Sequence, residues 1–176
     1  MLDRLYSLLA DIYLSLAFWY VVPFYQGGIL VRLGLVKRSL SPGLHWKIPG
    51  IDEVLTTDNQ VDTLELRPQS LTTADGKTIV VSGIVKYQIC DTTAFLLLLG
   101  NKNSVLQDVS VGAIKDIITN KSWSCIQEFN IERDICQQIR AEVNKYGFKI
   151  YKVTLANLAE VTTYRLIGNL PSGGVE

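Results

Sequence analysis

The stretch TADGKTIVVSGIVKYQI, residues 73–89, carries the clearest structural pattern in the chain. Its Asp75-Gly76 pair tolerates the positive φ angles of a tight turn and predicts a hairpin at this point. From Ile79 to Ile89 every second residue is apolar or glycine, and the intervening positions are partly polar. A period of two with one mixed face predicts a long, half-buried antiparallel strand.

The segments on either side of this strand are predicted from their own periodicity. Upstream, short β-type runs are separated by proline–glycine turns. Downstream, apolar residues recur every four positions, which is typical of helices, and Asn130 and Gly147 are suited to begin and end the second of them. The predicted elements are strands at residues 29–34 and within 52–66, helices around 105–118 and from 131 to 147, and a closing strand at 148–155. Strands, then helices, then a final strand indicate an α+β fold.

Length and charge narrow the class of protein. The 176 residues suit one domain, or one domain with an anchor. Lys+Arg and Asp+Glu both number 17, so the net charge of +0 offers no field for a nucleic-acid backbone, and we expect no nucleic-acid partner. Cys90, Cys125 and Cys136 are widely spaced, which predicts packed, reduced thiols rather than a disulfide framework.

The N-terminal segment is amphipathic at first and wholly apolar later. Residues 5–25 read LYSLLADIYLSLAFWYVVPFY, and aromatic residues gather near the end, as they do where an apolar segment meets lipid headgroups. We therefore predict a membrane-associating helix over residues 1–22, with a buried soluble helix as the alternative. The residues expected to contact the membrane are Leu5, Leu9, Ile12, Leu16, Phe18, Trp19, Tyr20 and Phe24.

How this segment meets the membrane stays open at this point. A span requires Asp11 to lie inside the bilayer, at a cost of up to about 3 kcal/mol. Pro23 ends or kinks a helix, and an in-plane or shallow insertion fits as well as a span. The positive charges that follow, Arg32, Lys37 and Arg38, favour the cytoplasmic side for the domain.

Four pieces of the chain, in order, resemble one known family. They are PFYQGGILVRLG (23–34), PGLHWKIPGID (42–52), the TADG hairpin (73–76) with its long strand, and GFKI (147–150). Together they resemble the SPFH, or band 7, domain of the stomatin, prohibitin, flotillin and HflK/C proteins, over about residues 21–155. About 20 residues follow Leu155 without sustained heptads, so we expect a short member that lacks the family's C-terminal coiled coil.

The resemblance implies an architecture and a role. It implies a mostly antiparallel sheet packed by helices over residues 23–156, after the helix of residues 1–22 and before a short tail, 157–176. It further implies a membrane-attached, self-associating scaffold that organises or shields membrane proteins or membrane microdomains. Expected partners are membrane lipids, further copies or related SPFH subunits, and a membrane-bound protease. The alternative is a soluble protein-binding module whose N-terminal helix docks on a partner.

No constellation in the sequence predicts catalysis, a cofactor or a metal. His45 is the only histidine and lies among turn residues without a nucleophile motif, so we expect it to hold a turn together. No paired carboxylates or metal-ligand spacing emerge. Trp46 fits either a core position or an interfacial anchor. The sequence thus predicts a protein that is not an enzyme.

Overall fold

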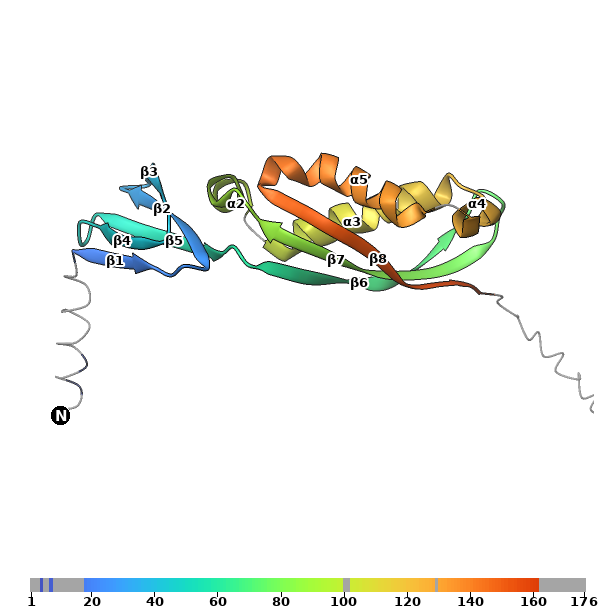
Figure 1. Ribbon diagram of the computed structural model, residues 1–176, viewed down its shortest axis with the longest axis horizontal. Coiled ribbons are helices and arrows are strands. Elements are labelled where there is room, and N and C mark those ends of the chain that lie inside the picture. The colour runs from blue at the N-terminus through green and yellow to red at the C-terminus, as the bar shows by residue number, and fades with distance from the viewer. Residues whose placement is uncertain (1–3, 5–6, 8–17, 100–101, 129, 162–176) are drawn as a thin grey trace, which may run out of the picture.

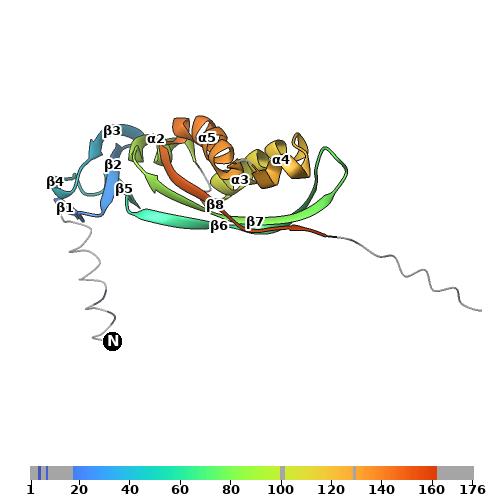
Figure 2. The same ribbon diagram turned by 45° about the vertical axis from the view of Figure 1, so that its right-hand side comes forward.

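The computed structural model in Figure 1 describes Arg4, Ser7 and residues 18–99, 102–128 and 130–161. The molecule is elongated, with a small β unit at one end and a larger α+β unit beside it along the long axis (Figures 1 and 2). Within residues 18–99, 102–128 and 130–161, helices occur only in the larger unit, from α2 onwards.

The larger unit is built on a three-stranded antiparallel sheet. Strands β6 (Val61–Thr72), β7 (Thr78–Ile89) and β8 (Phe148–Glu160) lie in the order β6–β7–β8. The odd-numbered residues of β7 face the core as predicted, and Ile79, Val81 and Val85 are fully buried. The predicted hairpin is also present: β6 and β7 are joined across Gly76, whose φ is 78°.

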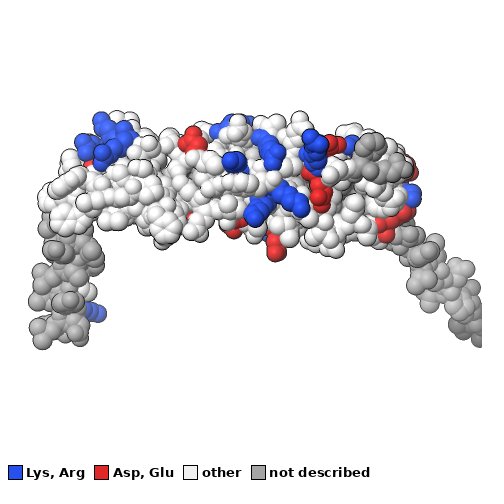
Figure 3. All heavy atoms as spheres, viewed as in Figure 1, with Lys and Arg blue, Asp and Glu red and all other residues white. Residues whose placement is uncertain are grey.

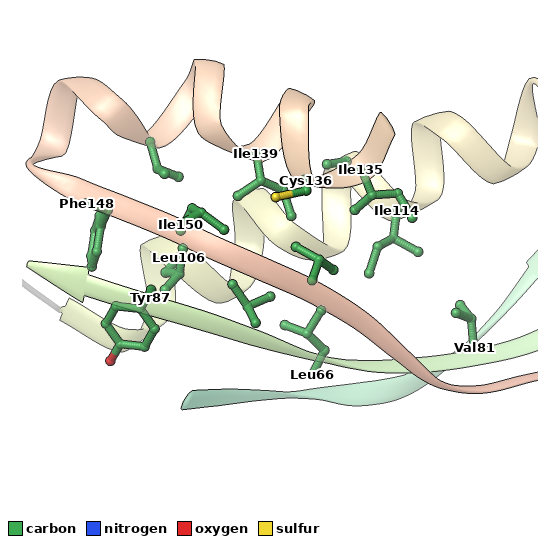
Figure 4. Close-up of a cluster of buried hydrophobic side chains, with 14 of the residues drawn as sticks. Leu66, Val81, Tyr87, Leu106, Ile114, Ile135, Cys136, Ile139, Phe148 and Ile150 are labelled. Carbon is green, nitrogen blue, oxygen red and sulfur yellow. The ribbon is translucent and has the colours of Figure 1, made fainter. Parts of the chain in front are cut away.

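Helices cover one face of this sheet. They are α2 (Thr92–Leu98), α3 (Lys102–Thr119), α4 (Trp123–Glu128) and α5 (Ile131–Val143), the last followed by the 3₁₀ turn η1 (Asn144–Tyr146). Figure 4 shows side chains of α3 and α5 meeting those of the strands, among them Ile114, Ile135 and Ile139. Burial of these apolar stripes is the main force that holds helices to sheet.

Both predicted helix boundaries are close to the observed ones. Asn130 occupies the N-cap of α5, although its side chain makes no capping hydrogen bond, and Glu132 and Asp134 lie in the first turn. Gly147 adopts a left-handed conformation with φ 82° after η1. A Cβ at this glycine would collide with the carbonyl oxygen of Asp91, so both the backbone angle and the close approach require glycine.

The N-terminal unit consists of two small sheets. Strands β3 (Leu35–Leu40), β2 (Gln26–Arg32) and β5 (Asp52–Asp58) form one, and β1 (Trp19–Val22) pairs with β4 (Gly43–Trp46) to form the other. Their shared core is small: Val22, Leu30 and Leu40 are buried, and Tyr20 and Val54 pack against them. Such a small core covers only one face of the β1–β4 ribbon.

Two predicted boundaries are wrong. The helix expected over residues 1–22 does not include Trp19–Val22, which form β1 because pairing with β4 gives their backbone groups partners and buries Val22. The tail expected from residue 157 begins later, since β8 pairs with β7 as far as Glu160. Leu5, Leu9, Ile12 and Leu16 lie outside the described residues. Among the helices described, none is long and apolar enough to cross a bilayer.

The two units are joined by close backbone packing at the start of α2. Asp91 caps α2 by accepting hydrogen bonds from the amides of Thr93 and Ala94, both at 3.0 Å. Asn59 donates its backbone amide to the carbonyl of Tyr25 at 2.8 Å, and its own carbonyl accepts from the side chain of Gln88. This network fixes β2 and β5 to the larger unit.

Gly27 gives a direct test of this junction. A Cβ there would meet Asn59 Nδ2 at 2.7 Å and Thr92 Oγ1 closer still. We expect Gly27→Ala to cost about 1–3 kcal/mol, because overpacking forces the junction apart. Thermal unfolding of the full chain in detergent should show a Tm lower by about 2–10 °C. The control Gly112→Ala, where a Cβ meets nothing within 4 Å in α3, should leave the Tm unchanged or raise it. An equal loss in both variants would contradict the close-packed junction.

Candidate functional site

The outer face of the β1–β4 ribbon is apolar and open. Residues on β1 alternate, so that Tyr20 and Val22 turn towards the small core while their neighbours turn away from it. Four residues form this surface, which we name the β1–β4 apolar face: Trp19, Val21, Leu44 and Trp46. Each is more than half exposed, at 55%, 60%, 64% and 68% respectively. A contiguous apolar surface of this kind marks an interaction site on a protein.

The register of the ribbon brings these side chains together. Trp19 lies opposite Trp46, and their rings make an edge-to-face contact with centroids 6.5 Å apart. Val21 lies opposite Leu44. The amide of Lys47 donates to the carbonyl of Phe18 at 2.9 Å, which extends the ribbon by one residue pair. The ribbon therefore extends to residue 18, the first residue of the described segment 18–99, and Phe18 is itself exposed.

The structure places the predicted membrane-contacting residues differently from one another. Phe18, Trp19 and Phe24 are exposed, and Phe24, in the turn after β1, is 85% exposed. Tyr20 is half-buried against the small core. Leu5, Leu9, Ile12 and Leu16 are outside the described residues, so their role stays a prediction.

Sequence reasoning missed part of this face. The core interpretation of Trp46 is wrong, because Trp46 belongs to a two-stranded ribbon whose single buried face carries other side chains. Val21 and Leu44 were not singled out, although the alternation in WYVV and GLHW is the signal that places them with the tryptophans.

A partly buried ion pair holds the loop that ends the ribbon. Arg32 donates to both carboxylate oxygens of Asp52, at 2.6 and 2.9 Å, and the side chain of Asp52 is fully inaccessible to solvent. The amide of Ile48 also donates to this carboxylate, at 2.8 Å. The hydrogen bonds from Arg32, together with that from the amide of Ile48, lower the pKa of Asp52 to about 2 against the opposing effect of desolvation. Asp52 thereby ties the end of β2 to the chain that follows Trp46.

The histidine and the cysteines of the described residues lie apart from one another and from the β1–β4 apolar face, except that His45 lies on β4. His45 Nε2 lies 2.6 Å from the carbonyl oxygen of Ser41, which confirms the predicted role of His45 in holding a turn. Cys136 is buried as expected, whereas Cys90 and Cys125 are exposed, so the prediction of packed thiols is wrong for these two. Within the described residues, no three His, Cys, Asp or Glu side chains are grouped so as to hold a metal ion.

The two edges of the larger sheet differ in how they meet solvent. Two side chains of α5 form hydrogen bonds with the outer backbone groups of β8. Arg140 donates to the carbonyls of Ile150 and Tyr151 at 2.8 and 2.9 Å, and Glu132 accepts from the amide of Leu155. Strand β6 forms the opposite edge, interrupted by an irregularity between Leu66 and Gln69 that includes Pro68. Both devices are typical of strands protected against uncontrolled pairing.

Helix α2 adds a second exposed apolar feature. Leu97 and Leu98 are both more than half exposed near its end, while Phe95 of the same helix is buried in the main core. The helix lies next to β2 and β5, at the junction of the two units. These two leucines are separate from the β1–β4 apolar face and are available to a protein neighbour.

The fold and this surface define an α+β domain with a helix-covered antiparallel sheet and an apolar β ribbon at one end. The family model for the SPFH domain / Band 7 family matches residues 20–164. The chain therefore belongs to the SPFH, or band 7, family.

Individual relatives agree with this assignment. Protein HflC of Vibrio parahaemolyticus is 32% identical over 93 residues, which cover 49% of this chain and 28% of HflC. Stomatin of Mus musculus is 22% identical over 144 residues, covering 78% of this chain and 50% of stomatin. An uncharacterised protein of Methanocaldococcus jannaschii is 23% identical over 141 residues, 78% of this chain and 70% of that protein. The chain thus spans less than a third of the HflC sequence and half of the stomatin sequence.

The Arg32–Asp52 pair makes the stability of the N-terminal unit depend on pH. Because the pKa of Asp52 falls from 3.8 to about 2 on folding, its stabilising effect is complete above 3.8 and is lost as the pH falls towards 2. We expect Asp52→Asn to unfold at a lower temperature than the parent chain at pH 7, with the difference narrowing as the pH falls through this window. The measurement is thermal unfolding across the acid range, with Asp108→Asn, an exposed position on α3, as the control. A difference that stays constant from pH 7 to pH 2 would show that the ion pair does not stabilise the fold.

Proposed function

We propose that the protein is a membrane-attached, self-associating scaffold that organises or shields membrane proteins, and that it is not an enzyme. The observation that carries the proposal is the β1–β4 apolar face, whose strand β1 follows the apolar N-terminal segment directly in the sequence. Membership of the SPFH family supports the same role. Attachment then uses both Leu5, Leu9, Ile12 and Leu16 of the N-terminal segment and the exposed aromatic residues of the ribbon.

The energy available from the ribbon is moderate. Burying the exposed half of a tryptophan removes on the order of 100 Å² of apolar surface from water, or about 2–3 kcal/mol. Trp19 and Trp46 together thus supply binding that is useful but reversible for a single copy. Several copies held in one assembly bind far more tightly, because each further contact is made at a high effective concentration. Weak attachment of each subunit and self-association are therefore complementary parts of one function.

The surfaces suited to self-association lie on the larger unit. Leu97 and Leu98 of α2 offer apolar contact area, and the side chains that block β8 direct association away from edge-to-edge strand pairing. The partners that fit this arrangement are further copies or related SPFH subunits, together with membrane proteins such as a membrane-bound protease. The positive charges after the N-terminal segment support the cytoplasmic side for the domain.

Flotation with liposomes tests the attachment. The full chain should rise with phosphatidylcholine vesicles, and Trp19→Ser/Trp46→Ser should lower the bound fraction at least tenfold, since about 4–6 kcal/mol of apolar burial is lost and only part is recovered by neighbouring side chains. The matched control is Ile84→Ser, an exposed apolar position on β7 of the larger unit, which should float like the parent.

The same experiment separates the two candidate functions. A full chain that stays in the soluble fraction would contradict membrane attachment and favour the soluble protein-binding module. A full chain that floats, with the ribbon variant floating equally well, would leave attachment to the N-terminal segment and contradict the role of the β1–β4 apolar face.

Sedimentation in detergent tests the self-association. We expect the extracted full chain to sediment as a species several times the mass of one copy. Leu97→Gln/Leu98→Gln should shift it towards the monomer, because the polar side chains remove the apolar contact while keeping a good helix. The ribbon variant Trp19→Ser/Trp46→Ser is the control and should stay associated. A monomer over a wide concentration range for the parent chain would refute the scaffold proposal.

A further inference from the structure

A cleft with cationic and aromatic walls opens beside the β1–β4 apolar face. Its volume is about 450 Å³, and its position at the end of the ribbon follows from the hydrogen bond between Lys47 and Phe18. The lining residues come from β2, β3, β4 and the chain that flanks the ribbon: Phe18, Leu30, Arg32, Lys37, Arg38, Trp46, Lys47 and Ile48. Four are cations, four are apolar and none is an acid.

A local irregularity in β3 places two cations on the cleft. In the β2–β3 ladder Leu30 pairs with Arg38 and Val31 pairs with Val36, so Lys37 is left without a partner. Adjacent residues of a regular strand point to opposite faces, whereas a bulge re-aims a side chain. This bulge accounts for the presence of both Lys37 and Arg38 in the lining of one cleft.

The charge of the cleft is not neutralised within the described residues. Arg32 is bound to Asp52, but the other ion pairs found there, Lys77–Glu160 and Lys121–Asp134, involve none of the remaining cations of the cleft. Arg38 uses one donor on the carbonyl of Trp46 at 3.1 Å and keeps further N–H groups for a ligand. Figure 3 shows Lys and Arg side chains gathered over the β3 end of the molecule, next to largely uncharged surface.

We propose that this cleft binds the phosphate of an anionic lipid headgroup, with Lys37, Arg38 and Lys47 supplying the charge. The inference rests on the proposed membrane attachment and adds to it a preference of the protein for lipids with a negatively charged headgroup. A guanidinium and two ammonium groups suit phosphate oxygens. The same cleft has an apolar wall formed by Phe18, Trp46 and Ile48. This wall suits the glycerol and upper acyl part of a lipid, whereas a free phosphate ion would make no favourable contact with it.

The position of the cleft supports a lipid as the occupant. Trp46 belongs both to the lining and to the β1–β4 apolar face, so a membrane that receives the face also brings headgroups to the cleft. Aromatic rings at the headgroup level beside basic side chains are the usual arrangement at a membrane interface.

The experiment compares vesicles of phosphatidylcholine alone with vesicles that mix phosphatidylcholine equally with phosphatidylglycerol. The full chain should bind the anionic vesicles more tightly. Lys37→Gln/Lys47→Gln should lower that binding about 25-fold, at about fivefold for each lysine near an anionic surface, and leave binding to phosphatidylcholine alone unchanged. The matched control, Lys86→Gln/Lys115→Gln, removes two exposed lysines of the larger unit and should change the anionic binding by less than about twofold.

Three outcomes would overturn the inference, and they are distinct from failure of attachment. Equal binding of the full chain to both kinds of vesicle would do so, as would equal losses in the two double variants, which would indicate diffuse charge. The third is a Tm of the full chain raised by inorganic phosphate at constant ionic strength, dependent on Lys37 and Lys47, with no preference for anionic vesicles. Binding to neither kind of vesicle would instead contradict the membrane attachment itself.

Discussion

Strand β7 is the element on which the rest of the larger unit depends. It is paired along both edges, with β6 on one side and β8 on the other, so its position fixes the whole sheet. Its odd-numbered side chains form the floor on which α3 and α5 pack, and a shift of one residue would turn Ile79, Val81 and Val85 to solvent. At Gly83 a Cβ would lie 2.9 Å from the carbonyl oxygen of Thr154, so β7 and β8 approach too closely there for any side chain. The register is thereby set by burial and by sterics together.

The N-terminal unit differs from the larger unit because its hydrophobic core is small. With Val22, Leu30 and Leu40 as its fully buried apolar centre, it can cover one face of the β1–β4 ribbon and leaves the other open. Short-range polar contacts compensate: the Arg32–Asp52 pair fixes one end, and the Asn59 network and the contact of Gly27 with α2 fix the other to the larger unit. An apolar face that is exposed yet rigidly held is what reversible binding to a surface requires, because little conformational entropy is lost on contact.

Sequence reasoning succeeded where periodicity and burial coincide. Three local patterns were predicted: the alternation in residues 79–89, the apolar stripe of α5 and the turn at Gly76. Each of them can be recognised from neighbouring residues alone and is consistent with burial in the core. It failed where partners distant in sequence decide. Trp19–Val22 read as the end of an apolar helix because only the pairing with β4, more than 20 residues later, makes a strand of them. The choice between a core position and an interfacial anchor for Trp46 stayed open for the same reason, and the β3 bulge that re-aims Lys37 leaves no trace in the composition.

The protection of the sheet edges bears on how copies of this domain could meet. The free backbone groups of an unpaired edge strand can pair with a strand of another molecule. Repeated pairing of this kind would give open-ended chains of molecules instead of a closed assembly. Here Arg140 and Glu132 satisfy the backbone of β8, and Pro68 with its irregularity breaks the regular edge of β6. In the self-association proposed above, side-chain contacts such as those of Leu97 and Leu98 would then set the geometry between copies. Because such contacts are specific in direction, they would suit an assembly that presents every apolar ribbon to one surface.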